Sequence, residues 1–171
     1  MTTPPFDPVS ERDIEIVSAQ LGRPARGVVG IAARCACGAP TVVATAPRLP
    51  DGTPFPTLYY LSHPAATAAM SRLEASGVMA ELSQLLHDDD DVRAAYQAAH
   101  HAYLADRDRI DHVDEIAGFS AGGMPTRVKC LHALAAHALA AGPGVNPIGD
   151  LALAQGDWSP DACECADYPV R

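Results

Sequence analysis

Residues 124–141 read MPTRVKCLHALAAHALAA, which is the most informative part of the sequence for the fold. From Val128 to Ala141 the residues that cannot ionise are all Ala, Leu or Val. A helix that is apolar all the way round is normally buried inside a domain. The sequence therefore predicts a central apolar helix over about residues 126–141, which ends before Gly142.

The same stretch also carries ionisable side chains, namely Arg127, Lys129, Cys130, His132 and His137. Such groups are costly to bury unless they are paired or bound to a ligand. On a regular helix Cys130 and His132 point in nearly opposite directions, and Cys130 and His137 lie about 10 Å apart along the axis. Unless the helix is distorted, we therefore expect only one of these three side chains in any single site, and we favour Cys130.

The part of the chain before residue 64 predicts one helix and a small sheet. Ser10 followed by Asp13 is typical of a helix start, and Gly22 is typical of a helix end. Runs rich in β-branched or aromatic residues then predict strands. These strand candidates lie at residues 27–33, 41–45 and 57–61.

The rest of the chain is predicted to be mainly helical. Helices are expected from Pro64 to Gly77, over 78–86 and 92–110, in the central stretch, and shortly after Asn146. We predict an α+β fold in which five or six helices pack on a small antiparallel sheet of about three strands. We expect a single domain over residues 1–171, with irregular segments at about 1–9 and 155–171.

Composition and charge exclude several classes of protein. The chain has 171 residues, of which 48% are hydrophobic and 19% charged, so it has enough apolar material for a core. Its formal net charge of -9 disfavours binding to nucleic acid or to anionic lipid. There is no apolar run of about 20 residues for a membrane span and no secretory signal pattern in Met1–Pro8. We therefore expect a cytoplasmic protein with no membrane partner.

Four of the five cysteines form two Cys-x-Cys pairs, Cys35/Cys37 and Cys163/Cys165. In a reducing compartment, metal binding or thiol chemistry is a better explanation for them than disulfides. In an extended segment residues i and i+2 point to the same side, so the two pairs can offer a Cys₄ set for zinc or an iron–sulfur cluster. The one-residue spacer is shorter than the usual zinc spacing. Alternatives are a site that includes Cys130, and cysteines that are inert buried thiols.

A glycine-rich loop precedes the central helix. Gly122 and Gly123 lie just before it, and Arg127 and Lys129 fall in its predicted first turn. Free backbone N–H groups at a helix start bind anions, so a small anionic ligand such as a phosphate or carboxylate is a candidate here. The same environment favours a thiolate at Cys130, which makes it a candidate nucleophile.

Two further sets of residues are weaker candidates for chemistry. Tyr96, His100, Tyr103 and Arg107 share one helix face, where His100 can act as an acid or base, or the face can be half-buried with its hydrogen bonds satisfied. His132 is the other candidate catalytic histidine. Glu74 and Asp150 are candidate carboxylates to which the sequence assigns no partner.

Several longer motifs resemble one family. They are DGTPFPTLY at 51–59, SAGGMP at 120–125, RVKCLH at 127–132 and GVNPIGD at 144–150. The chain resembles the bacterial "domain of unknown function 501" family from about Ile14 to Asp150. The resemblance implies that Cys35, Cys130 and His132 match the family's pattern. The resemblance implies no activity, cofactor or partner.

Three functional hypotheses follow. The leading one is a cytoplasmic metal-binding protein whose cysteines hold zinc or an iron–sulfur cluster. The second is an enzyme that uses Cys130 as a thiolate nucleophile and Arg127/Lys129 to bind an anionic substrate. The third is a non-catalytic adaptor with purely structural cysteines. The sequence does not identify a protein partner.

Overall fold

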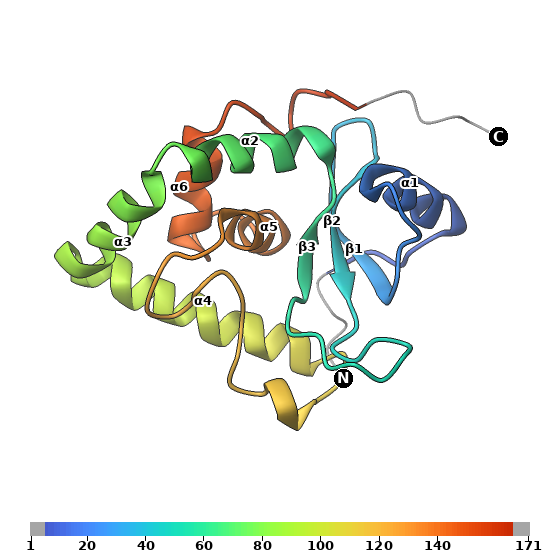
Figure 1. Cartoon of the computed structure of the whole chain (residues 1–171), viewed down its shortest axis with the longest axis horizontal. Helices are drawn as coiled ribbons and strands as arrows, with labels where there is room; N and C mark the ends of the chain where they lie inside the picture. The colour runs from blue at the N-terminus through green and yellow to red at the C-terminus, as the bar shows by residue number, and fades with distance from the viewer. Residues whose placement is uncertain (1–5, 166–171) are drawn as a thin grey trace.

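The computed structural model describes residues 6–165 and has the predicted α+β fold. A three-stranded antiparallel sheet lies between α1 on one face and the remaining helices on the other (Figure 1). The strands are β1 (Val28–Arg34), β2 (Pro40–Thr45) and β3 (Tyr59–Leu61). The helices are α1 (Glu11–Leu21), α2 (Pro64–Ala75), α3 (Val78–Asp88), α4 (Asp90–Asp108), the short 3-10 helix η1 (Asp114–Ile116), α5 (Leu131–Ala141) and α6 (Pro147–Gln155).

The irregular ends are described only in part. The irregular segments predicted at about 1–9 and 155–171 include residues 1–5 and 166–171, which lie outside the described residues. Between them and the core, Asp7 pairs with Ile31 of β1, and residues 156–165 contain neither helix nor strand.

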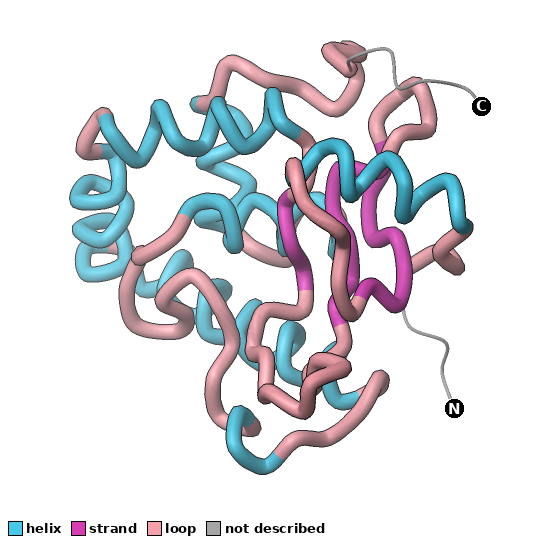
Figure 2. The backbone as a smooth tube through the Cα atoms, turned by 45° about the vertical axis from the view of Figure 1, so that its right-hand side comes forward, coloured by secondary structure: helices cyan, strands magenta, loops and turns pink. Residues whose placement is uncertain are grey.

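Local sequence signals explain how α1 and the sheet form. Ser10 caps the start of α1 as predicted and forms a capping box with Asp13, and Gly22 ends that helix in the left-handed conformation. Strand β2 is central in the sheet, and every residue in it is buried. Figure 2 shows α1 lying across the sheet and residues 156–165 passing near the turn between β1 and β2.

Helix α5 is the centre of the larger core, as the apolar stretch predicted. Leu131, Leu134, Ala135 and Ala136 are all fully buried. They pack among side chains from the inner face of the sheet, α2, α4 and α6. The sheet's other face forms a smaller core in which Val17 of α1 meets strand residues.

The predicted start of this helix at about residue 126 is wrong. Helix α5 begins at Leu131, and Cys130 is its extended N-cap residue, with φ −148° and ψ 110°. The carbonyl oxygen of Gly122 accepts hydrogen bonds from the backbone N–H groups of Lys129 (2.7 Å) and Cys130 (3.2 Å). Because these bonds hold the chain against the glycine loop, Arg127 and Lys129 lie before the helix and not in its first turn.

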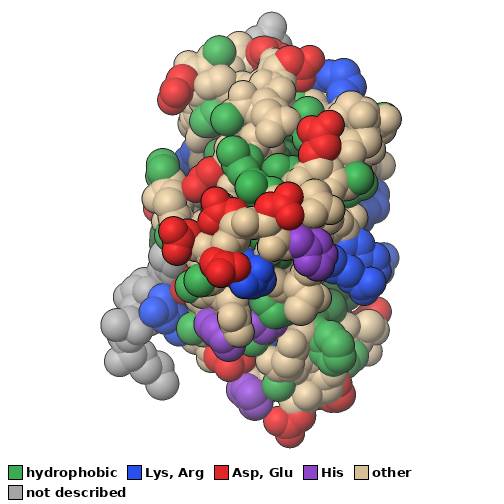
Figure 3. Space-filling model, turned by 90° about the vertical axis from the view of Figure 1, so that its left-hand side faces the viewer, with side chains coloured by type: hydrophobic (Ala, Val, Ile, Leu, Met, Phe, Trp, Pro, Cys, Tyr) green, Lys and Arg blue, Asp and Glu red, His purple; other side chains and the backbone are tan. Residues whose placement is uncertain are grey.

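The surface agrees with the acidic composition. Figure 3 shows acidic side chains spread over the face that points left in Figure 1. Within residues 6–165, no helix combines the length and the apolar character needed to cross a bilayer.

Candidate metal centre

The first pair of cysteines lies in the turn between β1 and β2. The backbone N–H of Cys35 donates to the Ala39 carbonyl (2.8 Å), and the N–H of Gly38 donates to the Cys35 carbonyl (2.8 Å). Gly38 has φ +91°, a conformation that suits glycine and lets the chain turn tightly after Cys37. Cys35 is buried and Cys37 is exposed, so one cysteine of the pair lies inside the protein and the other lies at its surface.

The second pair arrives from the segment after α6. Trp158 is buried against the ring of His63, with ring centroids 5.4 Å apart. The backbone N–H of Ala36 donates to the carbonyl of Pro160 (3.2 Å), which joins this segment to the hairpin turn. These contacts carry the chain past the turn and place Cys163 and Cys165 beside Cys35 and Cys37.

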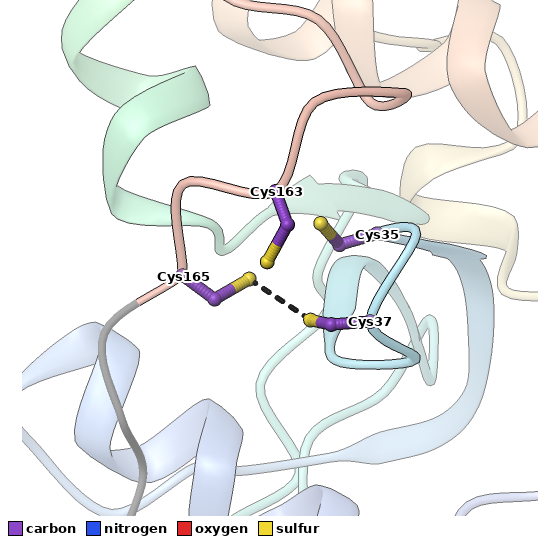
Figure 4. Close-up of side chains that lie close together, drawn as sticks. All are labelled: Cys35, Cys37, Cys163 and Cys165. Carbon is purple, nitrogen blue, oxygen red and sulfur yellow. Dashed lines mark hydrogen bonds between the residues drawn. The ribbon is translucent and has the colours of Figure 1, made fainter.

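The four cysteines form one cluster, which we call the four-cysteine site. Their sulfur atoms all lie within 4.8 Å of one another and point toward a common centre (Figure 4). The sulfur atoms of Cys37 and Cys165 form a hydrogen bond of 3.3 Å, and all four thiols are free. A tetrahedral zinc ion with bonds of about 2.3 Å places its four sulfur ligands about 3.8 Å apart. The donor set therefore fits a metal ion.

The thiols influence one another's ionisation. The backbone N–H of Ala39 and the thiol of Cys165 lower the pKa of Cys37 to about 7. Burial and the neighbouring thiols raise the pKa of Cys165. One thiolate thus disfavours the next, whereas a bound cation deprotonates its thiol ligands together. The cluster is chemically suited to a cation.

His63 contacts the four-cysteine site and was not among the predicted site residues. It is 1% exposed and is the N-cap residue of α2. Its Nδ1 accepts the backbone N–H of Ala66 (3.4 Å), so its proton lies on Nε2, which is 3.1 Å from the sulfur of Cys165. His63 can therefore donate a hydrogen bond to this sulfur. A histidine directly before Pro64, at a position where Ser, Thr, Asp or Asn is usual, was the available sequence signal.

A cavity of about 560 Å³ lies beside the four-cysteine site. Cys37, Cys163 and Cys165 line it on one side. Asp13 and Arg34 line it as well, and they form an ion pair of 2.7 Å that holds the pKa of Asp13 at about 2. The arginine is thus already paired with a carboxylate of the protein.

Cys130 does not join the four-cysteine site. It lies in a second group with Glu74 and His132, which we call the Glu-Cys-His cluster, and whose three donor atoms are all within 4.8 Å of one another. We expected a regular helix to keep Cys130 and His132 apart, but the two side chains lie close together because Cys130 is the extended N-cap and not a helical residue. Its sulfur is 4.0 Å from Nδ1 of His132.

Glu74 organises this second cluster. Its Oε1 accepts the backbone N–H of Leu131 at 2.8 Å and lies 3.0 Å from Nδ1 of His132. Hydrogen bonding with Cys130, and then with Glu74, raises the pKa of His132 to about 9, and the imidazole in turn lowers the pKa of Cys130. The carboxylate thus accepts the hydrogen bond of the first backbone N–H of α5. This N–H was a candidate donor to an external anion.

The predicted anion-binding residues do share one place on the surface. Gly122, Gly123, Arg127 and Lys129 line a cavity of about 330 Å³. Arg127 and Lys129 are exposed. Two cations thus flank the glycine loop, although the helix start itself is capped by Glu74.

The α4 face that was a candidate for acid–base chemistry is buried in the interior of the protein. Tyr96, Tyr103 and Arg107 are almost fully buried, and His100 is paired through Nδ1 with the hydroxyl of Ser120 (2.8 Å). The hydroxyl of Tyr103 accepts the backbone N–H of Leu58 (2.6 Å). The hydrogen bonds are satisfied as in the structural alternative, and the face is buried more deeply than the half-buried face expected there.

Comparison with known protein families identifies the family of this chain. The family described as "Protein of unknown function (DUF501)" matches residues 31–154. The chain belongs to this family. The matched range contains Cys35, Cys37, Cys130 and His132, whereas the Cys163/Cys165 pair lies beyond it. No curated protein and no solved structure matches the chain.

Proposed function

We propose that this protein of the DUF501 family is a zinc-binding protein and that Cys35, Cys37, Cys163 and Cys165 together hold one zinc ion. The observation that carries the proposal is the mutual approach of four sulfur atoms, all within 4.8 Å. Two Cys-x-Cys pairs that are 126 residues or more apart in sequence meet only because the fold brings them together. Tetrahedral thiolate sites favour zinc among the common divalent ions.

The spacing supports a single ion over an iron–sulfur cluster. In a cluster the thiolates bind to different iron atoms, so they must stand further apart than ligands of one ion. Sulfur atoms no more than 4.8 Å apart are close to the separation of about 3.8 Å that one tetrahedral zinc ion requires. We therefore choose zinc from the two cofactors that the sequence leaves open.

The role that suits this site is structural. Four protein ligands fill the tetrahedral shell and leave no position for a substrate, as in structural zinc sites. The ion would join the segment after α6 to the β1–β2 turn, which otherwise share the hydrogen bond from Ala36 to Pro160. Metal binding energy at such a site contributes directly to folding.

Elemental analysis of purified protein tests the proposal. Cys37→Ser and Cys165→Ser should each reduce the zinc content by about one equivalent relative to the parent protein. Ser159→Ala is the matched control, because Ser159 lies in the same segment and its hydroxyl accepts only the nearby N–H of Asp161. Zinc content that stays unchanged in both cysteine variants, or a visible iron–sulfur spectrum in the parent protein, would contradict the assignment.

A second candidate function is the binding of a small anion at the glycine loop. The cavity lined by Gly122, Gly123, Arg127 and Lys129 supports it, since two exposed cations and two glycines surround the same space. Phosphate should raise the melting temperature of the parent protein, and replacing both Arg127 and Lys129 with Ala should remove that rise. A melting curve of the parent protein that phosphate leaves unmoved would contradict this candidate.

A further inference from the structure

We infer that Glu74, Cys130 and His132 form a second zinc site, separate from the four-cysteine site and with an open coordination position. The three side chains supply one oxygen, one sulfur and one nitrogen, which are the donor types that zinc uses in proteins. They come from two elements, because Glu74 lies on α2 while Cys130 and His132 lie at the start of α5. The inference does not depend on the four-cysteine site.

The distances fit one ion. Oε1 of Glu74 is 3.0 Å from Nδ1 of His132, and that Nδ1 is 4.0 Å from the sulfur of Cys130. A tetrahedral zinc ion with typical bond lengths separates oxygen from nitrogen by about 3.4 Å and nitrogen from sulfur by about 3.5 Å. Each observed distance is within about half an ångström of the value that coordination requires, so small side-chain movements are enough.

The other side of the imidazole is arranged as in a zinc-binding histidine. Nε2 of His132 lies 3.2 Å from the carbonyl oxygen of Thr67 and 3.1 Å from the hydroxyl of Ser71. A carbonyl oxygen can only accept, so Nε2 carries a proton, and Nδ1 faces Glu74 and Cys130. Metal-binding histidines commonly donate their second N–H to a backbone carbonyl, which fixes the ring and raises the basicity of the ligating nitrogen.

Glu74 is held in place in a comparable way. Its Oε1 accepts the N–H of Leu131, and ligating carboxylates are often hydrogen-bonded in this manner. The side chains of Glu74 and His132 are 27% and 26% exposed. Water can therefore reach the ion. Three protein ligands and one water are the arrangement that distinguishes catalytic zinc sites from closed structural ones.

The competing account needs no metal. If Nδ1 of His132 also carries a proton, the ring is a cation that pairs with a thiolate on Cys130 and with the carboxylate of Glu74. Cys130 would then be a reactive thiol, and the cluster would bind no zinc. The two accounts predict different metal contents and different rates of alkylation at Cys130.

Native mass spectrometry of the full chain, purified without oxygen and titrated with zinc, separates them. We expect two zinc ions on the parent protein, one on His132→Ala and one on Cys37→Ser. His112→Ala is the control, because that histidine is exposed and pairs with Asp108 and Asp114, away from the Glu-Cys-His cluster. It should retain two. Ser71→Ala should weaken zinc binding at the second site about tenfold through the loss of a ring-orienting contact.

Glu74→Gln covers the case in which His132→Ala fails to fold. Its amide oxygen can still accept the N–H of Leu131, so the start of α5 keeps its cap while the zinc ligand loses its charge. The variant should show a native circular dichroism spectrum and lose at least tenfold in affinity for the second ion. The inference is overturned if the parent protein binds only the ion that Cys37→Ser removes. It is also overturned if His132→Ala keeps both ions, or if zinc does not slow alkylation of Cys130 by iodoacetamide.

Discussion

Arg107 carries a positive charge into the interior of the protein, where it is 1% exposed. Its guanidinium donates hydrogen bonds to the backbone carbonyls of Pro56 (2.8 Å), Ile116 (2.6 Å) and Phe119 (2.5 Å). These carbonyls belong to the loop before β3 and to the segment around η1. One side chain at the end of α4 thus joins two loops to the interior.

Removing this side chain should be costly. Arg107→Ala leaves three carbonyls without their donor and opens a void, so we expect a loss of about 3–5 kcal/mol in the free energy of unfolding. Urea denaturation measures it. Arg109→Ala is the matched control, since Arg109 is exposed and pairs with Asp106, and it should change stability by less than about 0.5 kcal/mol. Equal effects of the two variants would contradict this role for Arg107.

His137 makes stability depend on pH. It is fully buried between Tyr59 and Tyr103, its Nδ1 is 3.1 Å from the amide nitrogen of Asn146, and burial lowers its pKa to about 4. The unfolded chain, with an ordinary pKa near 6.5, binds the proton more readily, so stability falls as pH falls from about 6.5 toward 4. The contribution lost at pH 5 is about 2 kcal/mol.

The comparison with His137→Phe isolates this contribution. Both proteins keep the same cysteines, so any loss of metal in acid affects both. Urea denaturation at pH 7 and pH 5 should show a larger loss of stability in the parent protein than in the variant. The same pH dependence in both proteins would mean that His137 does not titrate in this way.

The site residues differ in how far the sequence could identify them. The two Cys-x-Cys pairs could be picked out as candidates from the sequence, because short-spaced thiols in a reducing compartment favour metal binding or thiol chemistry over disulfides. Glu74 and His63 could not be placed, because their partners come from α5 and from the segment after α6. Only the packing of those elements, which no local pattern encodes, brings the groups together.

Helices α5 and α6 approach each other closely. A Cβ atom on Gly149 would lie only 2.8 Å from the Cβ of Ala138 and would also collide with the carbonyl of Leu134. The glycine therefore permits backbone-to-backbone contact between the two helices. This contact sets the position of α6 and hence of the segment that carries Cys163 and Cys165.

Gly149→Ala should consequently destabilise the protein by about 2–3 kcal/mol, because a packed core resists overpacking. Gly118→Ala is the control, since a Cβ there meets nothing within 4 Å and φ is not in the left-handed region. Thermal denaturation of both variants checks the prediction. If Gly149→Ala has the same melting temperature as the parent protein, the close approach of α5 and α6 does not restrict residue 149 to glycine.

Element boundaries were predictable where the signal is local. The capping box of α1, Pro64 at the start of α2 and Asn146 before α6 all act at the predicted places. The start of α5 was not predictable, because it depends on the Gly122 carbonyl and on Glu74, which is distant in sequence. Because the prediction rested on apolar composition alone, it started the helix several residues too early.

The segment after α6 joins the far end of the chain to the β1–β2 turn. Trp158 is the only tryptophan in the chain and is 4% exposed. It packs on His63, which in turn contacts Cys165. The fluorescence of Trp158 therefore reports whether the four-cysteine site holds this segment in place.

Removal of the metal should release the segment. A chelator should shift Trp158 emission to longer wavelength and lower the melting temperature by roughly 10 °C, as expected for the loss of about 4 kcal/mol in a protein of this size. The same treatment should leave the emission of Cys37→Ser unchanged, since that variant already lacks the ion. A parent protein whose tryptophan emission does not respond to the chelator would contradict the structural role.

X-ray absorption at the zinc edge tests whether the four cysteines hold one zinc ion. The measurement uses His132→Ala, so that zinc at the Glu-Cys-His cluster does not contribute. We predict a single shell of four sulfur atoms at about 2.3 Å from the zinc. A shell that contains nitrogen or oxygen at about 2.0 Å, or protein that binds no zinc at all, would contradict the claim.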